Sequence, residues 1–198
     1  MEKKILINNI TTYRRIVLNN YDYYCKCKNN INTINGSISM GPDGDKFFNK
    51  LLIKKYEFAT QIIIFSALSI EAFINDYLIR YLDINYFNSL DKLEVKNKLV
   101  IGIRMVLNKD FPKDKKAYNY FSNLISLRNK LVHCKSFNFD FDNLIDNYLI
   151  EIDEKEIDHA LQVYNLIIKE LLVLQPDLDE SYLKKNDDIR DWYYINSV

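Results

Sequence analysis

The feature that most constrains this chain is a nine-residue, predominantly apolar stretch from Ile62 to Ile70, inside a long segment of helical character. At about 100° per residue, the side chains of residues 62–77 cover a helix nearly all round. Such a helix has to be surrounded by other elements. The stretch is about half as long as a bilayer span requires, so residues 46–82 are predicted to form the buried central helix of a soluble bundle, with no membrane segment.

Hydrophobic spacing predicts four further helices around this one. Ser89 and Asp153 are the expected N-cap residues of two of them, and Phe111-Pro112 is an expected break. The expected helices cover residues 2–28, 89–108 and 114–134, and the segment from Asp153 to shortly before Pro176. The fold class predicted is therefore all-α, a bundle of about five helices.

Three segments are less regular. Residues 29–45 are rich in Asn, Gly, Ser and Pro and predict a long loop, which at that length is either functional or disordered. Residues 137–152 fit either a short strand pair or an irregular helix. We expect one domain over residues 1–175 and a C-terminal tail over residues 176–198, which docks on the body or on a partner.

Charge is balanced in sum and uneven along the chain, with 27 basic and 27 acidic residues. This balance argues against a uniformly basic nucleic-acid binder but permits local basic surfaces. Residues 1–56 carry ten basic and four acidic side chains, residues 92–135 carry eleven and three, and residues 136–198 carry five and fifteen. The two basic stretches fit a surface for a phosphate backbone, or simply solvated helix faces.

The three cysteines form no framework for disulfides or metal. Cys25 and Cys27 are one residue apart, Cys134 is alone, and neither a secretory leader nor a Cys/His cluster with metal spacing is apparent. We expect free thiols and a cytoplasmic location, with no cofactor and no metal. His159 follows an acidic segment and is interpreted as a surface histidine.

Two charges are out of place in otherwise apolar helix faces. Arg128 falls in the middle of the apolar face of the helix predicted over residues 114–134, where it needs a partner or a polar cleft. Glu71 is the only charge between Glu57 and Asp76. A buried carboxylate needs a cationic partner, and Arg128 is the preferred one, with Arg104 as its competitor. A structural ion pair without further function is the simpler interpretation.

The string Arg128-Asn129-Lys130-Leu131-Val132-His133 resembles the Arg-Asn-x-x-x-His motif of the HEPN superfamily. It lies near the end of a late helix in an all-α chain, as in that family. Residues 67–75, with Glu71 embedded in an apolar helix, also resemble the family pattern. The resemblance extends from about residue 47 to residue 173.

The resemblance implies a homodimer whose facing motifs form one cleft that cuts RNA without a metal. His133 then acts as general acid or base, and Arg128 holds the phosphate and stabilises developing charge. Asn129 orients His133 or binds the phosphate, and Glu71 supports the site. The products end in 2′,3′-cyclic phosphate. The implied role is that of a toxin or a phage-defence (abortive infection) effector.

The chain departs from the family at one point. HEPN toxins that are silenced by a nucleotidyltransferase carry a tyrosine two residues after the histidine, where this chain has Lys135. A protein antitoxin or a phage-encoded activator remains open. One alternative is a non-catalytic HEPN module that binds a nucleotide, RNA or a protein. Another is a helical interaction protein that uses the acidic C-terminal third.

Overall fold

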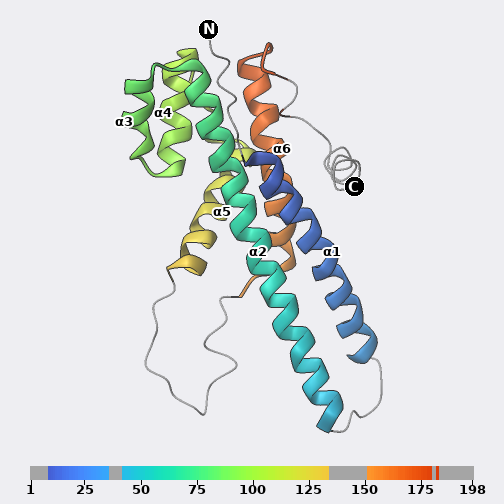
Figure 1. Ribbon diagram of the computed structural model, residues 1–198. Coiled ribbons are helices and arrows are strands. Elements are labelled where there is room, and N and C mark those ends of the chain that lie inside the picture. The colour runs from blue at the N-terminus through green and yellow to red at the C-terminus, as the bar shows by residue number, and fades with distance from the viewer. Residues whose placement is uncertain (1–8, 36–41, 134–150, 180–181, 183–198) are drawn as a thin grey trace, which may run out of the picture.

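The computed structural model describes residues 9–35, 42–133, 151–179 and 182, which form six helices and no strand. The all-α prediction is confirmed. The helices are α1 (Ile10–Asn35), α2 (Pro42–Tyr81), α3 (Ile84–Asp91), α4 (Val95–Leu107), α5 (Lys116–Val132) and α6 (Glu154–Leu174). In Figure 1, α2 runs along the whole molecule, α1 lies beside it, and α3 and α4 form a separate pair at one end.

The long helix α2 is the centre of the bundle and contacts each of the other five helices of the described chain. Ile62, Ile63 and Ile70 are fully buried, as the apolar circumference of this segment requires. By length and composition, Gly44–Tyr81 would also qualify as a membrane span, but 61% of its most apolar window is buried inside the bundle. A core helix meets the same criteria.

The loop predicted over residues 29–45 is wrong at both ends. Helix α1 continues to Asn35, because Ile31 is buried and keeps the asparagine-rich segment helical despite its low intrinsic propensity. The next helix begins at Pro42, a residue type accepted in a first helical turn because its missing N–H has no helical partner there. Residues 36–41 lie outside the described residues.

The helix predicted over residues 89–108 is two helices, and Ser89 is not a cap. The carboxylate of Asp83 accepts the Asn85 N–H at 2.9 Å and starts α3 upstream, while the Ser89 hydroxyl donates to the Asn85 carbonyl inside that helix. The buried ammonium of Lys98 binds Asp91 at 2.7 Å and Asn75 at 3.0 Å, and thereby ties α3 and α4 to α2.

The boundaries of the last two helices follow the predictions more closely. Helix α4 ends at Leu107, its C-cap Asn108 has a left-handed φ of 51°, and Phe111-Pro112 lies in the break before α5. Asp153 starts α6 through a capping box, in which its side chain accepts the Glu156 N–H and Glu156 accepts the Asp153 N–H. The segment over 137–152 lies outside the described residues up to residue 150.

The core extends past Pro176. Leu178 and Tyr182 are buried, and the Tyr182 ring meets Phe73 edge-on with 5.0 Å between centroids. The Tyr182 hydroxyl donates to the buried carboxylate of Asp76, which also accepts from Arg80 Nε at 2.9 Å. Burial, and then the bond to Asp76, raises the pKa of Tyr182 above its ordinary value, so the hydroxyl stays protonated. The first residues after α6 therefore belong to the folded body.

Removing the Tyr182 hydroxyl tests this attachment. Tyr182→Phe leaves the buried Asp76 carboxylate without one donor, so we expect the free energy of unfolding to fall by about 1–3 kcal/mol in urea denaturation followed by circular dichroism. Tyr86→Phe is the matched control, because Tyr86 is 59% exposed. Equal stability of Tyr182→Phe and wild type would contradict the attachment.

Candidate functional site

The motif residues gather at the C-terminal end of α5. Arg128 Nη2 lies 3.5 Å from Glu71 Oε2 on α2, and Arg128 Nη1 donates to Asn129 Oδ1 at 3.0 Å. Glu71 is thus the partner of Arg128 that the sequence favoured. The competitor, Arg104, instead pairs with Asp110 at 3.3 Å on the surface. Two partners in fixed helices restrict the rotation of the Arg128 guanidinium.

The Glu71–Arg128 pair is not sealed in the core. The Arg128 side chain is 24% exposed and that of Glu71 is 29% exposed. Both conditions that permit an arginine on an apolar face therefore hold, since Arg128 has a carboxylate partner and its face opens to solvent. The guanidinium is held in place but remains reachable by an anion from solution.

His133 is the C-cap residue of α5. Its backbone N–H donates to the Asn129 carbonyl at 2.9 Å, and its side chain is exposed. The side-chain oxygen of Asn129 is engaged by Arg128. This contact matches neither of the roles expected for Asn129, to orient His133 or to bind the phosphate, because the side-chain oxygen instead holds the arginine. His133 and Arg128 point in directions about 140° apart around the helix.

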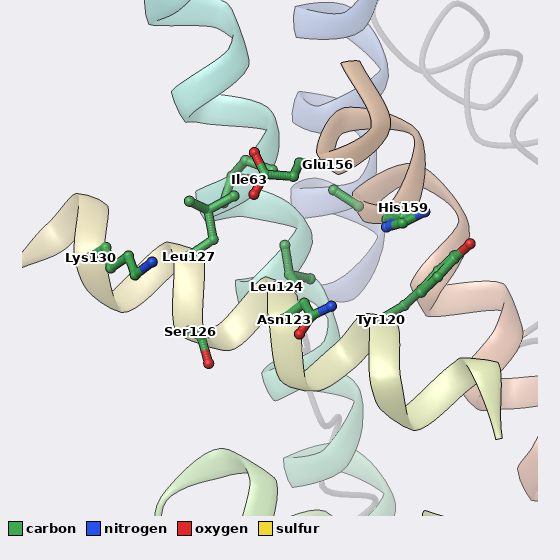
Figure 2. A pocket seen from close by; sticks show the side chains of 10 residues that line it. Ile63, Tyr120, Asn123, Leu124, Ser126, Leu127, Lys130, Glu156 and His159 are labelled. Carbon is green, nitrogen blue, oxygen red and sulfur yellow. The ribbon is translucent and has the colours of Figure 1, made fainter. Parts of the chain in front are cut away.

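A pocket lies between α5 and α6, on the flank of α5 away from Asn129. It encloses about 190 Å³ and has an apolar floor beneath polar side chains. In Figure 2, His159 and Tyr120 lie at one end of the pocket and Lys130 at the other. The lining residues are Ile63, Tyr120, Asn123, Leu124, Ser126, Leu127, Lys130, Glu156, His159 and Ala160.

The interpretation of His159 as a surface histidine is wrong. Its imidazole is half-buried and stacks on the Tyr120 ring, with 3.6 Å between centroids and 22° between planes. Lys116 Nζ lies 4.8 Å from the centroid of the same Tyr120 ring. The acidic residues around His159 suggested a solvated face, and only the packing of α6 on α5 brings the two rings together. No local sequence signal could have found this pair.

The remaining candidates give little chemistry. Among the residues that the structure describes, no three His, Cys, Asp or Glu side chains gather as metal ligands do. Cys25 and Cys27 carry free thiols. Lys28 pairs with Glu154 at 2.7 Å, so part of the basic N-terminal stretch is matched by the acidic C-terminal third of the same chain.

Comparison with family models, with curated proteins and with solved structures gave no match. The function therefore has to be inferred from the residues of this chain.

A double-mutant cycle tests how open the Glu71–Arg128 pair is. With Glu71→Gln and Arg128→Gln, we expect a coupling free energy of at most about 1 kcal/mol, since water reaches both side chains. If the ion pair were sealed in the core, removing one partner would instead lower the free energy of unfolding by about 3–5 kcal/mol. The same cycle at Arg104 and Asp110 is the exposed control and should give no measurable coupling. A loss of about 3–5 kcal/mol in the free energy of unfolding of either single variant would contradict a guanidinium that solvent can reach.

Proposed function

We propose that this chain is a metal-independent endoribonuclease of HEPN type that acts as a homodimer. The observation that carries the proposal is the guanidinium of Arg128, fixed by Glu71 and Asn129 at the same helix end as the exposed His133. A fixed, accessible cation and an exposed imidazole at one helix end suit attack at a phosphodiester. The resemblance of residues 128–133 to the Arg-Asn-x-x-x-His motif supports the same conclusion.

The reaction proposed is cleavage by internal attack. One histidine takes the proton from the ribose 2′-OH, and the ribose 2′-oxygen attacks the phosphorus atom. A protonated histidine gives its proton to the departing 5′-oxygen as the P–O bond breaks. Arg128 binds the phosphate oxygens and stabilises the extra charge of the phosphorane. The products are a 2′,3′-cyclic phosphate and a 5′-hydroxyl, and no step draws on a metal.

The geometry of the motif in one chain indicates that the proposed reaction needs two protomers. One His133 cannot be both base and acid in the same step, and it points about 140° away from Arg128 around α5. A second copy across a two-fold axis supplies the other histidine and another arginine. We infer that the α5 ends of two protomers face each other over one cleft, in a cytoplasmic toxin or phage-defence effector held off by a protein antitoxin or released by a phage-encoded activator.

The alternative is a non-catalytic module that binds a nucleotide, RNA or a protein. It is favoured by the same contacts, since Glu71 and Asn129 already engage both terminal nitrogens of Arg128. Under this alternative Arg128 serves structure, and a partner binds without being cut.

Variant proteins assayed on RNA in EDTA test the enzyme. We expect His133→Ala to lower the cleavage rate by about 10²–10⁴-fold, the usual contribution of a positioned acid or base. Arg128→Ala should lose a similar factor, because the phosphate loses its fixed cation. Arg104→Ala is the matched arginine control and should keep full activity, because Arg104 is exposed and paired elsewhere. Equal cleavage by His133→Ala and wild type would contradict the proposal, and binding of RNA without cleavage would favour the alternative.

The oligomeric state gives an independent test. Light scattering on the purified protein should report twice the chain mass of 23.6 kDa. His133→Ala should keep this mass, so that its loss of activity reflects chemistry and not dissociation. A monomer at concentrations where RNA is cleaved would rule out a composite cleft.

A further inference from the structure

The pocket between α5 and α6 has no part in the cleavage step proposed above. We propose that it binds one nucleobase of the RNA strand being cut and so sets a base preference near the cut site. The inference rests on the proposed function for the identity of the ligand. Its own support is the shape and chemistry of the pocket.

The size of the pocket suits one planar base. A cavity of about 150 Å³ accepts a single benzene ring, and pockets for drug-sized ligands start at about 300 Å³. The volume here is about 190 Å³. The floor is apolar, formed by Ile63, Leu124, Leu127 and Ala160. A flat heterocycle can bury its faces against such a floor while its edge stays near polar groups.

One end of the pocket already holds stacked rings. His159 and Tyr120 lie face to face, and Figure 2 shows them beside Asn123. Lys116 near the Tyr120 ring adds a cation over the same π-system. Stacking on aromatic side chains is the usual way in which proteins bind unpaired bases, and each such contact contributes about 1–3 kcal/mol.

Polar groups at the rim can read the edge of a base. The Asn123 amide offers a donor and an acceptor, and the Glu156 carboxylate is an acceptor. Glu156 Oε2 accepts the Asp153 N–H at 3.0 Å, which fixes the carboxylate and leaves Oε1 as the ligand oxygen. An acceptor in this place favours bases with an exocyclic amine. Adenine, cytosine and guanine should therefore bind better than uracil.

The pocket and the cleavage motif share one strip of α5. Ser126, Lys130 and His133 are spaced four and three residues apart and are all exposed, so they are neighbours on one surface. Tyr120 and His133 are separated by roughly 20 Å along the helix axis, at 1.5 Å per residue. A few nucleotides of single-stranded RNA cover this distance. Lys130 lies between the two sites, where a connecting phosphate would pass.

The two histidines of the chain permit a direct test. The ring signals of His159 report on the pocket and those of His133 on the motif, and the His133→Ala variant assigns them. The ligands are a short mixed-sequence RNA with 2′-O-methyl riboses, which internal attack cannot cleave, the four nucleoside 5′-monophosphates, and ribose 5-phosphate. Proton–carbon NMR spectra at fixed pH follow each titration.

We expect the RNA and the monophosphates of adenosine, cytidine and guanosine to shift the His159 signals, and ribose 5-phosphate not to do so. The RNA should bind at least about tenfold more tightly than the mononucleotides, because the motif and Lys130 add contacts. Asn123→Ala should weaken the His159 response about tenfold. Asn119→Ala is the matched control, one turn away, exposed and outside the pocket lining, and should behave as wild type.

Three results would overturn the inference. If only the His133 signals shifted, the proposed ribonuclease activity would be unaffected, but the pocket would not be an RNA-binding site. An equal response to ribose 5-phosphate would mean that the pocket takes phosphate and not a base. Equal affinity for RNA and mononucleotides would assign the pocket to a free nucleotide. Failure of cleavage is a separate result, since none of these titrations requires the chain to cut RNA.

Discussion

Glu71 is the one charged side chain in the apolar middle of α2, and the candidate site depends on how this charge is balanced. Arg128 from α5 balances this charge, with its Nη2 atom 3.5 Å from Glu71 Oε2. The pair lies near the surface, and both side chains keep about a quarter of their area exposed. The pair links the end of α5 to the central helix. It also leaves a guanidinium held in position where an anion can reach it, which is a requirement for catalysis by charge stabilisation.

The parts of the fold that the sequence predicts are those dictated by burial or by local hydrogen bonds. The apolar circumference of residues 62–70 requires a surrounded helix, and α2 is surrounded. The Asp153–Glu156 capping box starts α6 where the local pattern places it. The Glu71–Arg128 pair could be predicted because each charge is anomalous on its own helix, and two such anomalies of opposite sign are expected to meet.

The parts that could not be predicted depend on contacts between distant segments or on a choice between competing local signals. Helix α1 extends beyond its predicted end because the burial of Ile31 outweighs the low helix propensity of the neighbouring asparagines. Asp83 caps α3 upstream of Ser89, and the expected third helix is interrupted between the end of α3 at Asp91 and the start of α4 at Val95. The acidic surroundings of His159 predict a solvent-exposed side chain, whereas the packing of α6 on α5 stacks it on Tyr120. For α1 and His159 the deciding contact comes from a segment remote in sequence, and for α3 one local capping residue competes with another.

The central claim is that the end of α5 cleaves RNA by internal attack, and the chemistry of the product ends tests it most directly. Total RNA treated with the wild-type protein in EDTA should yield fragments that end in 2′,3′-cyclic phosphate and begin with 5′-hydroxyl, because the ribose 2′-oxygen is the nucleophile. Fragments that end in 3′-hydroxyl and begin with 5′-phosphate would show that water attacked instead. That result would contradict the roles assigned to His133 and Arg128.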